Sequence, residues 1–168
     1  QEIAITDRLT KAYNRWGFYD LAEIEIERTK RYQYPLSLIT FDLDHFKRIN
    51  DTYGHPTGDL VLEKTAARCK NKLRASDIFG RMGGEEFAIL MPEANEAGAQ
   101  LVAERIRQAV SEPITFDGDS LTITVSLGVT SLSKEHFNLG KMLWCADRAL
   151  YQAKEKGRNQ VVVGCKDV

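Results

Sequence analysis

The sequence has little cysteine, no long apolar run and no excess of charge of one sign. Its three cysteines, Cys69, Cys145 and Cys165, form no close pairs, and an odd count without close pairs argues against a disulfide framework or a zinc site. Isolated thiols are typical of a reducing compartment, so we expect the cytoplasm. The net charge of −1 gives no reason to expect a nucleic acid or a membrane surface as a partner.

Two further absences concern the membrane and secretion. No apolar run is long enough to span a bilayer, and no signal-peptide pattern is present. The chain of 168 residues begins with Gln1 rather than Met. We therefore expect a piece of a longer protein, with residues 1–6 as the end of a linker from an N-terminal regulatory region. The larger protein could be a membrane-bound sensor whose cytoplasmic part is this domain.

What is present is typical of one globular domain over residues 1–168, with 43% hydrophobic and 28% charged residues. Asp7 or Thr10 is expected to cap the first helix, Asp59 to cap the third, and Gly157 to end the last. The order of elements predicts an α/β (α+β) fold, a single mixed sheet with helices packed around it and a ferredoxin-like βαββαβ core. Periodicity predicts helices over 7–34, 46–50, 60–73, 95–111 and 139–156, and strands over 36–41, 77–81, 86–91, 121–129 and 161–163.

The most informative segment is a predicted hairpin. Gly83 and Gly84 stand between two apolar runs and suit a type I′ turn, which needs positive φ at both central residues. Glu85 and Glu86 then lie at the tip of a rigid turn, where carboxylates can hold a hard divalent cation that bridges a phosphate-bearing substrate. The alternative is a solvated turn whose two glutamates have no function.

A second acidic cluster favours the metal site. Asp42 comes at the end of the strand predicted over 36–41, and three carboxylates converge if the hairpin lies beside that strand. Converging carboxylates repel each other and, when buried, need a cation or protons. Mg²⁺ takes one or two of them together with waters and phosphates. Neighbouring residues on a strand face opposite sides, so the spacing favours one of Glu85 and Glu86 without saying which. Asp44 is as well explained by a turn or helix cap as by a ligand role.

Three other groups of polar residues each allow two interpretations. Asn50 and Asp59 could read the edge of a guanine or could be turn and cap residues, and His55 between them could be structural or lie at the substrate's edge. Lys154 and Arg158 could clamp phosphates or could complement the dipole of the last helix. Arg74 and Asp77 could bind a guanine or a phosphate, although a weak surface ion pair explains them as well.

Taken together, these residues resemble the GGDEF domain, the diguanylate cyclase domain of bacterial signalling. The resemblance extends from Asp7 to about Val163. The motifs that carry it are, in order, Asp7-Arg8-Leu9-Thr10 with Asn14-Arg15, Phe41-Asp42-Leu43-Asp44-His45-Phe46-Lys47, Asn50-Asp51, Gly54-His55-Pro56-Thr57-Gly58-Asp59, Gly83-Gly84-Glu85-Glu86-Phe87, Ser126-Leu127-Gly128-Val129, and Asp147-Arg148-Ala149-Leu150-Tyr151 through Ala153-Lys154 to Gly157-Arg158-Asn159.

The resemblance implies a palm-like fold similar to nucleotidyl cyclases, and a homodimer that condenses two GTP into cyclic di-GMP and releases two pyrophosphates. It implies that Asp42 and Glu85, with the Leu43 carbonyl, hold Mg²⁺ or Mn²⁺, and that Glu86 is a second ligand or a supporting carboxylate. The remaining roles it implies are guanine recognition by Asn50 and Asp59, phosphate binding by Lys47, Lys154 and Arg158, and inhibition by cyclic di-GMP at Arg74 and Asp77, joined by Arg105 and by Arg28 of a partner subunit.

Two other functions stay open at this point. The chain could be a catalytically inactive receptor that senses cyclic di-GMP through Arg74 and Asp77, or it could serve only as a dimerisation module of a larger signalling protein. The intact Gly-Gly-Glu-Glu turn favours an active enzyme over the receptor.

Overall fold

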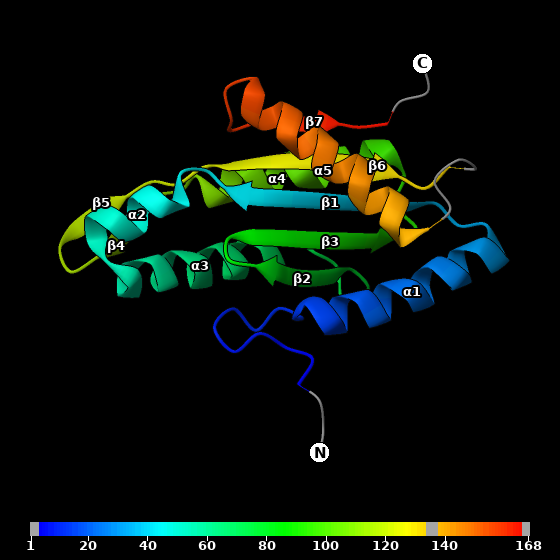
Figure 1. The fold of residues 1–168 in the computed structure, drawn as a ribbon, viewed down its shortest axis with the longest axis horizontal. Coiled ribbons are helices and arrows are strands. Elements are labelled where there is room, and N and C mark those ends of the chain that lie inside the picture. Colours follow the sequence, from blue (N-terminus) through cyan, green and yellow to red (C-terminus); the bar gives the residue numbers. More distant parts are fainter. Residues whose placement is uncertain (1–3, 134–137, 166–168) are drawn as a thin grey trace.

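The computed structural model describes residues 4–133 and 138–165. A five-stranded sheet in the order β2-β3-β1-β6-β7 forms its centre, and a small two-stranded sheet joins β4 to β5 (Figure 1). The elements, in chain order, are α1 (Arg15–Tyr32), β1 (Leu36–Leu43), α2 (Phe46–Tyr53), α3 (His55–Lys70), β2 (Ile78–Gly83), β3 (Glu86–Pro92), α4 (Glu96–Val110), β4 (Ile114–Phe116), β5 (Asp119–Leu121), β6 (Val125–Ser131), α5 (Leu139–Glu155) and β7 (Val161–Val163).

The central strand β1 organises the sheet. It pairs antiparallel with β3 on one side and with β6 on the other, and β2 continues the sheet beyond β3. Read along the chain, β1, α3, β2, β3, α4 and β6 form the predicted βαββαβ core in ferredoxin-like order. The short β7 pairs parallel with β6, which makes the sheet mixed as expected.

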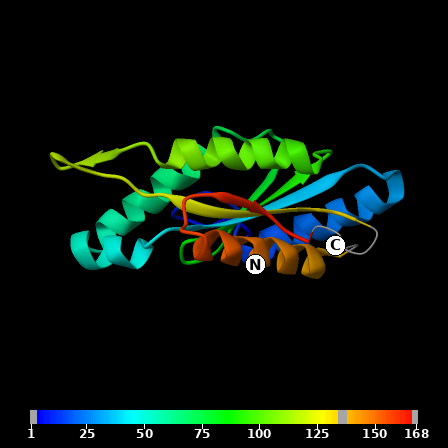
Figure 2. The same ribbon diagram turned by 90° about the horizontal axis from the view of Figure 1, so that it is seen from above.

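Helices cover both faces of the sheet, α3 and α4 on one and α1 and α5 on the other (Figure 2). Side chains alternate across β1, so Ile39 and Phe41 pack in the core beneath α3 and α4, while Leu38 packs in the core beneath α1 and α5. Thr40 and Asp42 have the parity of Leu38 and therefore face α1 and α5. This alternation places a buried carboxylate on an otherwise apolar face.

Several predicted helix starts were wrong. Helix α1 begins at Arg15, where the Asn14 side chain accepts a hydrogen bond from the Gly17 backbone N–H. Asp7 and Thr10 instead lie in the preceding loop. Helix α3 begins at His55, four residues before the expected cap, so Asp59 lies inside the helix and caps nothing. Residues 51–59, which stand between the helices predicted over 46–50 and 60–73, are helical on both sides of Gly54, whose φ of 90° separates α2 from α3.

The strand predicted over 121–129 is divided. Strand β5 ends at Leu121 and β6 begins at Val125, because the chain between them leaves one sheet and enters the other. The sequence analysis also missed the β4–β5 hairpin. Its turn is Asp117-Gly118, and both residues have positive φ, 46° and 81°. An Asp-Gly pair is a strong signal for a two-residue hairpin turn and could have predicted it.

The expectation about cysteine was wrong as well. Cys145 of α5 and Cys165 after β7 form a disulfide with a Cα–Cα distance of 5.5 Å, although they are 20 residues apart in sequence. They meet because β7 returns alongside α5. Cys69 is free and buried. In the part of the chain that the structure describes, no helix combines the length and the apolar character needed to cross a membrane.

Candidate functional site

The Gly-Gly-Glu-Glu segment forms a hairpin with a different turn from the one predicted. Gly83 pairs with Glu86, so the two central residues are Gly84 and Glu85. Gly84 has a φ of 50°, but Glu85 is not among the residues with positive φ, and the expected type I′ turn was therefore wrong. An irregularity in the pairing between Arg81 and Gly83 lies directly before the turn.

This hairpin lies beside the end of β1. Asp42 and Glu86 are directly opposite each other in the antiparallel pairing of β1 with β3. The Leu43 backbone N–H donates a hydrogen bond of 3.3 Å to the Glu85 carbonyl oxygen. The structure thus brings Asp42, Leu43, Glu85 and Glu86 together at one end of the sheet, although more than forty residues separate the two segments in sequence.

Asp42 is the most buried of these carboxylates. It is only 6% exposed, and its Oδ2 forms an ion pair with Nζ of Lys154 from α5. Its Oδ1 is buried and has no hydrogen-bond partner among the described residues. Burial raises the pKa of Asp42, Lys154 opposes that rise, and the charges of Glu85 and Asp147 add to it. An unsatisfied carboxylate oxygen in this setting is suited to a cation.

Glu86 and Asp147 extend the acidic cluster. Glu86 and Asp147 both keep an exposed surface, but partial desolvation raises the pKa of each carboxylate. The charges of Asp42 and Asp147 raise the pKa of Glu86 further, and Lys154 opposes the rise in both residues. All three carboxylates line a pocket of 340 Å³ on the α1/α5 side of the sheet, together with Arg15, Tyr19 and Lys154.

The geometry suits a cation that is bound only in part by the protein. Among the described residues, no group of three or more His, Cys, Asp or Glu side chains is arranged to enclose a metal ion. Mg²⁺ ordinarily takes one or two carboxylates and completes its shell with waters and substrate phosphates. The free Oδ1 of Asp42, the neighbouring Glu85 and the Leu43 carbonyl at the end of β1 fit such an open site. Mn²⁺ accepts the same oxygen ligands.

Asp44 is satisfied by the protein itself. Its carboxylate accepts hydrogen bonds from the Thr124 hydroxyl at 2.7 Å, the Ser126 hydroxyl at 2.7 Å and the Asn159 backbone N–H at 3.1 Å. These donors come from β6, from the segment before it and from the turn after α5. Asp44 therefore ties three segments together, and the ligand role that the sequence left open has no support.

Asn50 and Asp59 lie on adjacent helices that approach closely. The Asn50 side chain occupies the space beside Gly58, where an added Cβ would come within 1.8 Å of the Asn50 Oδ1. Only a glycine allows this approach. Asp59 follows Gly58 on the exposed surface of α3, so the two residues that could read a guanine flank one junction. Lys47 in the first turn of α2 and His55 at the start of α3 are both exposed.

Lys154 and Arg158, the two cations near the end of α5, differ in their contacts. Lys154, in the last turn of α5, reaches into the pocket and pairs with Asp42. Arg158 lies beyond the helix end with a φ of 65°, and its side chain is exposed. Only Lys154 is thus brought into contact with the carboxylates.

The Arg74–Asp77 patch is well ordered by its own hydrogen bonds. Arg74 donates to Asp77 from its backbone at 2.8 Å and from its guanidinium at 3.0 Å, and also reaches the Pro92 carbonyl at 2.6 Å. Arg105 is exposed on α4, and Arg28, on α1, pairs with Glu25 at 3.5 Å. Because α1 and α4 cover opposite faces of the sheet, one chain does not bring Arg28 and Arg105 together (Figure 2).

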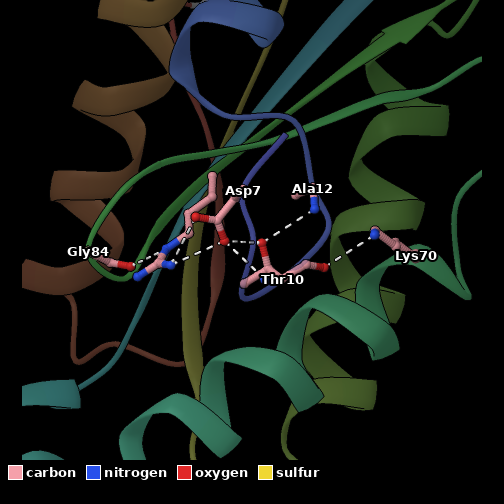
Figure 3. A network of polar contacts seen from close by, with 6 residues as sticks. Asp7, Thr10, Ala12, Lys70 and Gly84 are labelled. Carbon is pink, nitrogen blue, oxygen red and sulfur yellow. Dashed lines mark hydrogen bonds and ion pairs between the residues drawn. The ribbon is translucent and has the colours of Figure 1, made fainter. Parts of the chain in front are cut away.

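A polar network that the sequence analysis did not predict braces the hairpin turn (Figure 3). The Arg81 guanidinium donates to the Gly84 carbonyl at 2.9 Å and to Asp7 Oδ2 at 3.2 Å. Asp7 also accepts from the Thr10 backbone and hydroxyl at 3.0 and 2.7 Å. The Thr10 carbonyl in turn accepts from Lys70 of α3 at 3.2 Å. The loop before α1 therefore supports the turn that carries Glu85.

Sequence reasoning also assigned no role to Asp147. Its spacing carried a signal, because residues seven apart on a helix lie on one face, and Asp147 stands seven residues before Lys154. For Arg81 the sequence offered no comparable signal, since its partner Asp7 is distant in sequence and lies in a loop that was predicted to be helical.

Comparisons with known proteins agree with this geometry. The family model described as "Diguanylate cyclase, GGDEF domain" matches residues 4–160. Response regulator PleD of Caulobacter vibrioides is 41% identical over 164 residues, which cover 96% of this chain and 36% of PleD. Diguanylate cyclase DgcP of Pseudomonas aeruginosa is 43% identical over 163 residues, covering 95% of this chain and 24% of DgcP. The chain thus spans well under half the length of these curated relatives.

The structure is also similar to solved domains. The GGDEF domain of DgcB from Caulobacter crescentus, solved in complex with c-di-GMP, superposes with a TM-score of 0.92 at 32% identity, covering 97% of this chain and 94% of that one. The palm-like fold of nucleotidyl cyclases, expected from the sequence, is therefore confirmed.

Proposed function

Because the chain belongs to the GGDEF family, we propose that it is a diguanylate cyclase domain, which condenses two GTP into cyclic di-GMP and releases two pyrophosphates. The observation that carries this proposal is the meeting of Asp42, Glu85 and Glu86 beside Lys154, with one buried Asp42 oxygen left without a partner. A site of this kind suits a phosphate-bearing substrate accompanied by a divalent cation.

Asp42, Glu85 and the Leu43 carbonyl would hold Mg²⁺ or Mn²⁺. When bound, the cation neutralises the triphosphate charge and favours attack by a 3′-oxygen on the α-phosphorus. Lys154 can then exchange Asp42 for a phosphate oxygen, with Lys47 and Arg158 as further phosphate contacts. Asn50 and Asp59 offer the mixed donors and acceptors that a guanine edge requires, and His55 lies beside them.

The proton of the attacking 3′-hydroxyl needs an acceptor. Glu86 is suited to this role because desolvation and the charges of Asp42 and Asp147 raise its pKa, which makes it a stronger base. Glu85 lies one residue away and could share the role from the metal side. The 3′-oxygen then bonds to phosphorus as pyrophosphate leaves.

One domain binds one GTP, and each 3′-hydroxyl must attack the phosphate of the other molecule. We therefore propose a two-fold symmetric homodimer in which two pockets face each other. Feedback inhibition by cyclic di-GMP is assigned to Arg74, Asp77 and Arg105, with Arg28 supplied by a partner subunit. The complex of the related DgcB domain with c-di-GMP supports product binding in this family. The opposite placement of Arg28 and Arg105 also suits a site shared between subunits.

The proposal is tested by following pyrophosphate and cyclic di-GMP formation from GTP and Mg²⁺. We expect Asp42→Asn to lower turnover by at least about a hundredfold, since it removes the charge that the cation requires without changing the shape of the side chain. Asp119→Asn, at an exposed position of the β4–β5 hairpin that does not line the pocket, is the matched control and should retain full activity. Full turnover in Asp42→Asn would refute the assignment.

The same assay separates the alternative function. Binding of cyclic di-GMP by calorimetry, with no turnover at any protein concentration, would identify a receptor that works through the well-ordered Arg74–Asp77 pair. A dimerisation module without other function would bind neither nucleotide. We place the protein in the cytoplasm because its proposed substrate is found there. The cysteines do not support this location, because two of them form a disulfide.

A further inference from the structure

A disulfide joins the middle of α5 to the residue that follows β7. The bond between Cys145 and Cys165 closes a covalent ring across a sequence separation of 20 residues. Asp147 and Lys154, which line the acidic pocket, lie within this ring. So does Asn159, whose backbone N–H donates to Asp44 at 3.1 Å. The ring therefore contains two pocket residues, Asp147 and Lys154, and also Asn159, which holds Asp44 at the end of β1.

The two sulfur atoms are in different environments. Cys145 is fully buried against the sheet, whereas Cys165 is half-buried at the periphery. Backbone contacts hold their two segments together independently of the bond. The Gly164 N–H donates to the Val129 carbonyl at 2.8 Å, and a Cβ on Gly164 would come within 2.6 Å of the Cys145 carbonyl oxygen. After reduction, the two thiols would therefore remain close enough to reform the bond.

From these contacts, we propose that Cys145 and Cys165 form a reversible redox-modification site whose oxidant is a small disulfide of the glutathione type. The Cys165 thiolate attacks one sulfur of the oxidant, forming a mixed disulfide and releasing one glutathione thiolate. The Cys145 thiolate then attacks the Cys165 sulfur, closes the protein disulfide and releases the second glutathione. Two protein thiols lose two electrons and two protons, and the oxidant becomes two thiols.

The third cysteine provides an internal reference. Cys69 is completely buried in the core beneath α3, and burial raises the pKa of its thiol, which suppresses the reactive thiolate. Cys145 is equally buried, but it attacks only its neighbour Cys165 and needs no contact with the small disulfide, whereas Cys69 is free and must meet the oxidant directly. Reaction is therefore confined to the Cys145–Cys165 pair while the chain is folded. This inference concerns the thiols and the stability of the α5–β7 segment, and it does not depend on the proposed nucleotide chemistry.

The test uses the whole 168-residue chain, equilibrated with glutathione buffers from fully reducing to fully oxidising, then denatured and alkylated with iodoacetamide. Intact mass should show one adduct, on Cys69, from the oxidised form and three adducts from the reduced form, and the change should be reversible. Peptide mapping should recover a linked pair that contains Cys145 and Cys165. Oxidation should raise Tm by roughly 5–15 °C, since the ring restrains the unfolded chain.

Two variants sharpen the result. Cys165→Ser, a change at the periphery, should remove both the mass transition and the shift in Tm, whereas Cys69→Ala should retain both. Hydrogen exchange should show greater protection of the second half of α5 in the oxidised form of Cys69→Ala. Three adducts from the fully oxidising buffer, or a glutathione adduct that stays on Cys165 without closing the ring, would overturn the proposal.

Discussion

At the scale of single residues, the site combines groups that stabilise the fold with groups that strain it. Asp42 is buried, faces other carboxylates and, among the described residues, forms an ion pair with Lys154 alone. Burying a charge without full compensation is costly, so a carboxylate of this kind is retained for chemistry rather than for stability. Asp7 is the opposite case, because hydrogen bonds from Thr10 and Arg81 outweigh the effect of its burial and lower its pKa.

The raised pKa of Asp42 predicts how stability depends on pH. The folded protein holds this proton more tightly than the unfolded chain, whose carboxyl has its ordinary value of 3.8. Stability is therefore greatest when Asp42 is protonated and falls as pH rises through the folded pKa. We expect Asp42→Asn to reduce this decline and to be more stable than the wild type by about 1 kcal/mol at pH 7. Urea unfolding of both proteins from about pH 4 to pH 8 measures this difference in the free energy of unfolding.

Asp7→Asn is the natural control, with the opposite sign. The lowered pKa of Asp7 stabilises the folded protein at pH values above 3.8, the ordinary pKa of this carboxyl. This stability is lost as the pH falls through the folded pKa. The substitution should therefore destabilise the protein at pH 7 and have a smaller effect in acid. If both variants shifted stability equally at every pH, the roles given to these two carboxylates would be wrong.

Inhibition by product is also decided at the residue scale. Arg74 is half exposed and is oriented by Asp77, so Arg74→Ala removes the charged fork while leaving the core intact. We expect the concentration of cyclic di-GMP that halves turnover to rise about tenfold or more, with uninhibited turnover unchanged. Lys64→Ala, on the exposed surface of α3, should be inhibited by cyclic di-GMP at the same concentration as the wild type. Unchanged inhibition in Arg74→Ala would remove this patch from the account.

Residue types and spacing predicted part of the site and not the rest. The segments carrying Asp42 and Glu85 could be paired because each follows an apolar run with clear turn signals. The role of Asp44 could not be predicted, because its three hydrogen-bond donors come from distant segments. The Asp7–Arg81 contact could not be predicted for the same reason, because the residues around a loop position do not indicate which distant side chain it contacts.

At the scale of elements, the errors concentrate where local signals compete. The helix predicted over 95–111 was correct to within a residue at each end, and the Asn95 side chain accepts from the Gly98 N–H as an N-cap should. Asp59 has the same preference for a cap but lies inside α3, because Pro56 starts that helix earlier, at a position where proline is favoured. The packing of α2 against α3 decides the boundary, and that packing is invisible in a window of sequence.

The junction between α2 and α3 gives a prediction about substrate recognition. Ala at Gly58 gains helix propensity but places a Cβ within 1.8 Å of the Asn50 Oδ1 and 3.3 Å of the Phe46 ring. Asn50 must therefore move from its place beside position 58. We expect the KM for GTP to rise about tenfold in Gly58→Ala, the effect of losing one hydrogen bond to a guanine.

Gly140→Ala, in the first turn of α5, is the matched control. Among the described residues, its Cβ would meet only the Asn138 Oδ1, at an ordinary 3.4 Å, so the variant should gain stability with no change in KM. Steady-state kinetics with GTP and thermal unfolding of both variants test the difference. A KM equal to the wild-type value in Gly58→Ala would separate Asn50 from guanine recognition.

At the scale of the whole molecule, the order of elements was enough to predict the topology. A βαββαβ arrangement has few ways to form one sheet with short connections, and the structure has the expected one. The disulfide could not be predicted, because it depends on where β7 returns after α5. Three isolated cysteines favour free thiols on statistics alone, and only the three-dimensional path brings two of them together.

The proposed homodimer predicts a kinetic signature. If dimer formation limits turnover, the rate follows the square of protein concentration, and doubling the concentration should raise the total rate about fourfold at low concentration. A fusion to a parallel two-stranded coiled coil should make the rate linear in concentration, because the second subunit is then held nearby. A linear rate in the unfused chain, at concentrations where ultracentrifugation finds only monomer, would contradict a shared site.

The borders of the five-stranded sheet have a consequence for how copies of this chain can meet. On one border, Tyr13 bridges to Gly80 and so occupies part of the outer side of β2, and on the other border β7 is only three residues long. In the described part of the chain, neither border offers a long row of free backbone groups for a second sheet to continue. Self-association is thereby steered away from strand-to-strand growth, which ends in fibres, and toward contacts between side chains.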